Sequence, residues 1–104
     1  MKARPLRESD IEKRLVQRVK ELGGECRKMK WIGRNGAPDR VCMLPGVRSQ
    51  VFSEYHPDRT IWVELKAPGA KPEPHQLREH ARMRKMGQRV EVVDSYERVE
   101  EILK

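Results

Sequence analysis

The chain has 104 residues, which is enough for one small domain over 1–104 and too little for two independent hydrophobic cores. Lys and Arg number 23 against 16 Asp and Glu, so the net charge of +7 favours a polyanionic partner such as nucleic acid. Two widely spaced cysteines and the lack of a long apolar run argue against a disulfide-rich scaffold and a membrane-spanning helix. We therefore expect a cytoplasmic protein with reduced thiols and no membrane contact.

The first predicted element is a helix that follows Ser9. Ser9 and Glu12 match a capping box, in which each side chain accepts a hydrogen bond from the other residue's backbone N–H. Apolar residues then recur at helical spacing, and Gly23-Gly24 ends the pattern. The apolar face consists of Ile11, Leu15, Val16, Val19 and Leu22.

Three strands are predicted next. The first covers 25–32, the second 40–44 after a glycine-rich loop, and the third is the TIWVELKAP stretch that begins at Thr60. Successive side chains of a strand point to opposite faces, so alternate residues of the third strand share a face. One face carries Ile61, Val63 and Leu65, and the other carries Trp62, Glu64 and Lys66. Residues 47–59 have no clear pattern; they could extend a hairpin or form a subunit contact.

The second half of the chain predicts a helix, a strand and a helix. Pro74 suits the first turn of a helix that runs to about Met86 and stops at Gly87. Residues 89–94 predict a fourth strand, and Ser95 caps a terminal helix. The apolar positions of that helix are Val99, Ile102 and Leu103. The order αβββαβα predicts an α/β fold with a mixed four-stranded sheet flanked by helices.

Two charges on the third strand raise the question of chemistry. Glu64 and Lys66 project from one face about 7 Å apart, and such a pair is most often an ordinary solvent-facing one. Asp39 begins the second strand, however, and a hairpin would bring its carboxylate beside Glu64. Two neighbouring carboxylates suit a hard divalent cation such as Mg²⁺. Asp58 is only six residues before Glu64, roughly 20 Å along an extended strand, and cannot share that ion.

Three other side chains could complete a hydrolytic site. Lys66 could orient an attacking water and offset negative charge that develops on phosphorus. Gln76, near the start of the second helix, could hold a phosphate or the Glu64–Lys66 edge, or be an ordinary exposed residue. Glu12 is explained by its capping role, but it also borders the buried face and could reach a metal from the first helix.

Basic side chains near the Asp39 loop are candidate DNA contacts, and Trp31 lies among them. The candidates are Arg27, Lys28, Lys30, Trp31, Arg34, Arg40, Lys71 and Arg78. A second basic cluster, at 78–85, could grip phosphate or simply be solvated. His75 and His80 are five residues apart, which is not the i, i+4 spacing of helical zinc ligands, so both are expected to be solvated.

Four segments together resemble the VRR-NUC family of the PD-(D/E)XK nuclease superfamily. They are Pro38-Asp39-Arg40, the VELKAPG stretch at 63–69, Gln76 and Gly87-Gln88-Arg89-Val90. The resemblance covers nearly the whole chain and implies a restriction-endonuclease-like core, αβββαβ, with a C-terminal helix. It is to the stand-alone members of phages and bacteria, which implies a bacterial or phage-infected host cytosol.

The resemblance also implies roles for individual residues. Asp39, Glu64 and the Leu65 carbonyl would bind Mg²⁺ or Mn²⁺, with Glu12 as a possible further ligand. Lys66 would be the catalytic lysine and Gln76 the supporting polar residue. No organic cofactor is implied.

The implied activity is metal-dependent endonucleolytic cleavage of DNA in replication or repair. Stand-alone members resemble Holliday-junction resolvases, so the preferred substrate would be branched DNA and the enzyme a homodimer. A homodimer also suits the thin core expected from 37% hydrophobic residues. Two alternatives stay open: a non-catalytic basic DNA-binding protein, and an interaction subunit of a phage repair complex.

Overall fold

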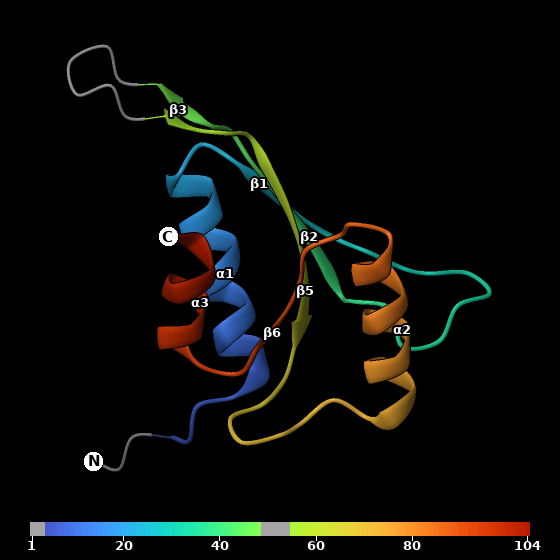
Figure 1. Ribbon diagram of the computed structural model, residues 1–104. Coiled ribbons are helices and arrows are strands. Elements are labelled where there is room, and N and C mark those ends of the chain that lie inside the picture. The colour runs from blue at the N-terminus through green and yellow to red at the C-terminus, as the bar shows by residue number, and fades with distance from the viewer. Residues whose placement is uncertain (1–3, 49–54) are drawn as a thin grey trace.

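The computed structural model describes residues 4–48 and 55–104. The elements occur in the predicted order αβββαβα, with one small ribbon in addition (Figure 1). They are α1 (Glu8–Glu21), β1 (Glu25–Lys28), β2 (Arg40–Leu44), β3 (Val47–Arg48), β4 (Tyr55–His56), β5 (Arg59–Leu65), α2 (Pro74–Lys85), β6 (Val90–Val93) and α3 (Tyr96–Leu103). Within this described part of the chain, no helix has the length and apolar character needed to cross a membrane.

A four-stranded mixed sheet lies at the centre, in the order β1-β2-β5-β6. β1, β2 and β5 are antiparallel neighbours, whereas β6 runs parallel to β5. A parallel pair needs a crossover connection, and α2 supplies it. α1 and α3 lie side by side on one face of the sheet, and α2 lies on the other (Figure 1). The predicted fold class is thus confirmed.

The ribbon β3–β4 continues the hairpin formed by β2 and β5 beyond Pro45-Gly46. The described ends of 47–59 therefore agree with the first interpretation, a hairpin extension, and residues 49–54 lie outside the described residues. Asp58 belongs to this end of the molecule, where its carboxylate accepts a 2.6 Å hydrogen bond from the Gly46 N–H.

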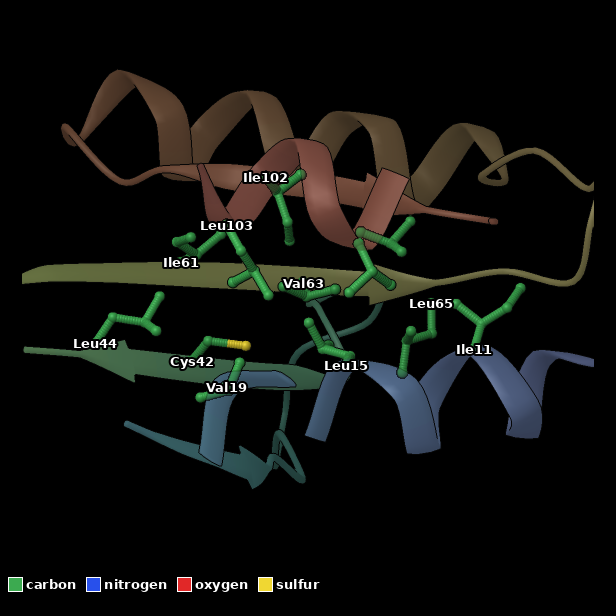
Figure 2. Packing of buried hydrophobic residues seen from close by; sticks show 12 residues of the cluster. Ile11, Leu15, Val19, Cys42, Leu44, Ile61, Val63, Leu65, Ile102 and Leu103 are labelled. Atoms are coloured by element: carbon green, nitrogen blue, oxygen red, sulfur yellow. The ribbon is translucent and has the colours of Figure 1, made fainter. Parts of the chain in front are cut away.

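The core fills the space between α1, α3 and one face of the sheet (Figure 2). The predicted alternation along β5 is confirmed, because its odd-numbered apolar residues all enter this core. The core residues drawn and labelled in Figure 2 are Ile11, Leu15, Val19, Cys42, Leu44, Ile61, Val63, Leu65, Ile102 and Leu103. Cys26 and Cys42 face each other across β1 and β2 as free thiols, with sulfur atoms 3.6 Å apart. Two cysteines that are distant in sequence are therefore neighbours in the fold.

The start of α1 differs from the prediction. The helix begins at Glu8 with Arg7 as its N-cap, and the Asp10 carboxylate accepts the Arg7 N–H at 2.9 Å. The Ser9–Glu12 capping box is therefore wrong. Asp10 also accepts bonds of 2.6 and 2.8 Å from Arg4. Because the helix begins at Glu8, Ser9 lies inside its first turn and is not the N-cap.

The first strand is shorter than predicted. β1 ends at Lys28 rather than at residue 32, and the Met29 N–H makes a last bond to the Asp39 carbonyl. Beyond that point Trp31 turns to donate its indole N–H to the Pro38 carbonyl at 2.9 Å. The later boundaries agree with the prediction to within a residue, and the Ser95 hydroxyl caps α3 by accepting the Arg98 N–H at 3.0 Å.

Candidate active site

The candidate site lies on the α2 side of the sheet, where β2 begins and β5 ends. Arg40 pairs with Val63 in the β2–β5 register, so one further step places Asp39 opposite Glu64. A carboxylate oxygen of Asp39, Oδ2, accepts the Leu65 N–H at 2.9 Å. The hairpin thus brings the two carboxylates together, as the sequence predicts, and fixes Asp39 by a bond to the backbone.

Glu64 is a buried carboxylate with only one of its oxygens bonded. The residue is 2% exposed. Oε1 accepts a 2.8 Å hydrogen bond from Gln76 and lies 3.7 Å from the Lys66 ammonium, whereas Oε2 has no hydrogen-bond partner among the described residues. Burial, and then the charge of Asp39, raise the pKa of Glu64 to about 7, while Lys66 opposes the rise. The charged form of Glu64 is therefore disfavoured, mainly by burial, and Lys66 offsets only part of this effect.

Gln76 holds Glu64 from the first turn of α2. Its Oε1 accepts the Glu73 N–H at 2.8 Å, and its Nε2 donates to Glu64. An N–H can bond only to the amide oxygen, so the Glu73 contact determines which end of the amide faces Glu64. Of the two interpretations left open by the sequence, an exposed helix residue and a residue bound to the Glu64–Lys66 edge, the geometry agrees with the second.

His80 is a residue that the sequence prediction placed incorrectly. It is completely buried rather than solvated, with Nε2 3.9 Å from Glu64 Oε2, and within the part of the chain that the structure describes neither ring nitrogen has a hydrogen-bond partner. Burial, and then the charge of Arg84, lower the pKa of His80. The spacing between His75 and His80, tested for zinc ligands, does not indicate that His80 lies near Glu64. The spacing of four between Gln76 and His80 could have indicated it, because residues i and i+4 share a helix face.

Two of the acidic residues on α1, Glu8 and Glu12, have different surroundings. Glu12 accepts a 3.1 Å bond from the Arg40 Nε, and Arg40 also donates to the Cys26 carbonyl at 3.4 Å. Glu12 and Arg40 thus bind each other in this structure. Glu8, in the first turn of α1, contributes the smallest of the effects that raise the pKa of Glu64. The sequence prediction missed Glu8 because the helix was expected to start after it.

The other candidate DNA contacts come from separate parts of the chain. Trp31 is half-buried against Trp62, with ring centroids 5.4 Å apart, and Arg34 pairs with Glu79 at 3.0 Å. Arg27 pairs with Glu25 at 2.6 Å. The remaining four are exposed: Lys28, Lys30, Lys71 and Arg78.

In the second basic cluster, Arg82 pairs with Glu79 and Arg84 donates to the Val90 carbonyl, so neither is simply solvated.

The residues at the site are compatible with a magnesium-like ion. Across 4–48 and 55–104, no three His, Cys, Asp or Glu side chains gather as a metal cluster. An ion would depend on Asp39, on the unbonded oxygen of Glu64, on the Leu65 carbonyl and on water. Mg²⁺ commonly takes one or two carboxylates and keeps several waters, so this small set of oxygen ligands fits it.

Comparisons with known proteins extend over nearly the whole chain. No family model matches it. Over 92 residues it is 46% identical to "Putative nuclease p44" of Acyrthosiphon pisum secondary endosymbiont phage 1, covering 88% of this chain and 87% of that protein. A solved structure described as a VRR_NUC domain superposes with a TM-score of 0.72 and 38% identity, covering 92% of each chain. The similarity thus includes the helices and sheet as well as the short motifs.

Proposed function

The chain belongs to the VRR-NUC family of nucleases, and from this premise we propose that it is a Mg²⁺- or Mn²⁺-dependent DNA endonuclease. Residues 1–104 would form a single nuclease domain that hydrolyses phosphodiester bonds. The observation that carries the proposal is Glu64, a buried carboxylate beside Asp39 with one oxygen that no group in 4–48 or 55–104 bonds. Such an oxygen is costly in a merely structural role, and a bound cation would satisfy it.

Asp39, Glu64 and the Leu65 carbonyl would hold the ion. When bound, the ion would supply a Lewis acid that polarises a phosphate oxygen and makes nearby water a stronger acid. The pKa of Glu64 near 7 means that the cation and protons compete for its carboxylate around neutral pH. Glu12 would join only if it released Arg40, so we place it as a positioning residue for β2 rather than as a ligand.

Lys66 and Gln76 would act on the substrate and on Glu64. The Lys66 side chain is mostly buried and its ammonium lies 3.7 Å from Glu64 Oε1, so a phosphate at the ion would lie near a positive charge. That charge would orient an attacking water and offset negative charge on the reacting phosphate. Gln76 would keep Oε1 occupied and so leave Oε2 directed at the ion.

We further propose branched DNA as the preferred substrate and a homodimer as the active form. Support comes from the basic net charge and from large apolar side chains that the single chain leaves exposed, such as Leu22 and Ile32. A junction offers two symmetric strands, which suits a twofold-symmetric enzyme.

The test is a cleavage panel of four-way junctions, flaps, single strands and linear duplexes, with Mg²⁺, Mn²⁺ or EDTA. We expect metal-dependent cutting of branched substrates, and its loss in Glu64→Ala while DNA binding and the thermal unfolding transition persist. Exposed Leu77→Ala on α2 is the control and should cut normally. Binding without cutting in every metal would instead favour a non-catalytic DNA-binding protein, and normal cutting by Glu64→Ala would remove Glu64 from the site.

A further inference from the structure

A small aromatic pocket adjoins the candidate site, and we propose that it binds one unpaired nucleobase of the DNA strand being cut. Its walls come from the loop after β1, from β5 and from the C-terminal half of α2. The lining residues used below are Trp31, Arg34, Trp62, Met83, Met86 and Gln88. This inference rests on the proposed nuclease function and names the feature of the substrate that the protein would recognise.

The two tryptophans are fixed in place and offer ring faces rather than N–H groups. The Trp31 indole N–H donates to the Pro38 carbonyl at 2.9 Å, and the Trp62 N–H donates to Gln88 Oε1 at 2.8 Å. The rings are tilted by 51° with centroids 5.4 Å apart, and both remain partly exposed. A nucleobase stacks on such a face regardless of its identity, because every base has a π-face.

Two methionines also line the pocket. Met83 is buried, and Met86 is 65% exposed at the end of α2. Thioether side chains are flexible and make favourable contacts with aromatic rings, so they can adapt to either a purine or a pyrimidine. The pocket therefore suits a flat ring without demanding one particular base.

Hydrogen-bond donors with spare capacity stand at the same pocket. Gln88 uses its amide oxygen for Trp62, which leaves its NH₂ group as a donor. Arg34 is bound to Glu79 through Nε, and its side chain is still 52% exposed. Base carbonyls and ring nitrogens accept hydrogen bonds, and the positive charge of Arg34 suits a phosphate backbone. These donors favour a nucleotide over a purely apolar occupant.

The size of the pocket limits what can enter. Its volume is about 230 Å³. Sites for whole drug-sized molecules measure roughly 300–1,000 Å³. The pocket is therefore suited to a single ring system with its sugar outside. A paired base inside a duplex could not reach it, whereas an unstacked base at a branch, flap or single strand could.

The pocket lies close enough to the candidate site for one DNA strand to reach both. Trp62 and Glu64 share a face of β5 about 7 Å apart along the strand. On α2, Gln76 and Met83 are seven residues apart, roughly 10 Å at 1.5 Å per residue. One strand of stacked DNA covers this in about three nucleotides at roughly 3.4 Å each. A base held in the pocket would thus fix the cleaved phosphate a few nucleotides away.

The chain contains two tryptophans, and both line this pocket, so their fluorescence reports its occupancy. Wild-type protein in EDTA is titrated with oligothymidylate and with a base-free oligomer of the same length and phosphate count. Anisotropy of labelled oligomers gives the affinities separately. We expect oligothymidylate to quench the tryptophan emission and the base-free oligomer to bind about 5- to 100-fold more weakly without quenching, as the loss of a stacked base implies.

Two variants on α2 provide the matched comparison. Met86→Glu places a charge at the pocket, and Leu77→Glu makes the same charge change at an exposed position that does not line it. Met86→Glu should weaken oligothymidylate binding more than Leu77→Glu does, while the two variants should bind the base-free oligomer equally. Unfolding curves verify that both variants fold.

Several results would overturn the inference. Three of them concern DNA: no quenching at saturation, no oligothymidylate binding, or equal weakening of that binding by the two variants. The fourth is tryptophan emission of the wild type that changes with protein concentration in the absence of DNA, together with no such change in Met86→Glu. The last would mean that a second copy of the chain fills the pocket. Quenching by oligothymidylate together with no cutting in Mg²⁺ or Mn²⁺ would instead remove the nuclease proposal and keep the pocket.

Discussion

At the scale of the residue, the surroundings of Glu64 distinguish it from an ordinary strand glutamate. It is buried on the α2 side, opposite Asp39, and the nearby His80 is itself buried without a hydrogen bond. The pKa of His80 is lowered by burial, so the ring stays neutral at neutral pH and supplies no positive charge there. Lys66 thus places one positive charge beside Glu64, and when Glu64 and Asp39 are both ionised that single charge does not balance them, so a divalent ion would neutralise the rest.

The sequence could predict where Glu64, Asp39 and Lys66 lie, and the spacing from Gln76 could indicate the helix face of His80, but the sequence could not predict that His80 is buried. Strand alternation and hairpin return depend on local chain geometry, which a single sequence reveals. The burial of His80 depends on the angle at which α2 crosses the sheet, and that angle is determined by packing between distant segments. The same holds for Glu12, because its partner Arg40 is 28 positions further along the chain.

The raised pKa of Glu64 predicts a pH-dependent stability. The unfolded carboxyl titrates near 4.5 and the folded one near 7. The folded state therefore binds the proton more tightly, and its stabilising effect is complete below pH 4.5 and lost as the pH rises to 7. At 1.36 kcal/mol per pH unit, the loss is roughly 3 kcal/mol. Urea unfolding in EDTA should show this decline from pH 4.5 to 8 in wild type, relative to Glu64→Gln.

The Glu64→Gln variant serves as the control, since its amide does not titrate. Adding Mg²⁺ at pH 8 should raise the unfolding free energy of wild type and leave Glu64→Gln unchanged. Parallel pH profiles for the two proteins would mean that the charge of Glu64 is already compensated without metal.

At the scale of the element, the loop between β1 and β2 contacts both the sheet and α2. Trp31, near its start, binds the Pro38 carbonyl and packs against Trp62, and Gly36 lies against the first turn of α2. The sequence predicted a loop from its glycines and proline, but it extended the preceding strand to residue 32. β propensity favours an aromatic residue in a strand, whereas here Trp31 makes its contacts outside the sheet.

Gly36 is the position where this loop is most sensitive to substitution. It has φ +84°, and a Cβ there would lie 2.7 Å from the His75 carbonyl oxygen and 2.9 Å from the Gln76 Cα. Gly36→Ala combines a left-handed backbone cost of about 1–2 kcal/mol with a backbone clash, so we expect a loss of roughly 2–4 kcal/mol in unfolding free energy. The start of α2 would shift, and with it Gln76, so cleavage should fall as well.

Gly33→Ala separates the clash from the backbone cost. Gly33 also has a positive φ, +74°, but no atom of the described residues lies within 4 Å of a Cβ built there. It should lose only about 1–2 kcal/mol and keep normal cleavage. Equal losses of stability in the two variants, measured by chemical denaturation, would mean that the contact between the loop and α2 is unimportant.

At the scale of the whole molecule, the sheet separates the apolar core from the candidate site. One face, under α1 and α3, holds the apolar core (Figure 2), and the other, under α2, carries Glu64, the tryptophans and the pocket. The fold class was predictable because each element has its own periodicity and stop signals. The ribbon β3–β4 was only one of two alternatives, since 47–59 has neither a regular pattern nor a two-residue turn to fix its register.

This division predicts which lysines contribute to DNA binding. Lys71 lies in the connection from β5 to α2, between Lys66 and Gln76, and it is exposed. A lysine that contacts one phosphate contributes about 0.9 to the slope of log affinity against log salt concentration. Lys71→Ala should therefore weaken binding of every DNA substrate about equally and lower that slope by about one. Salt titrations of binding in EDTA provide the measurement.

Lys104→Ala is the matched control, because this substitution removes the same charge from the opposite face. Lys104 follows α3, which covers the core side of the sheet, away from α2 (Figure 1). Lys104→Ala should leave the salt slope unchanged, since a charge on that face makes no phosphate contact. A general effect of net charge would instead lower affinity equally in both variants. That outcome would mean that DNA does not approach the protein specifically from the α2 side.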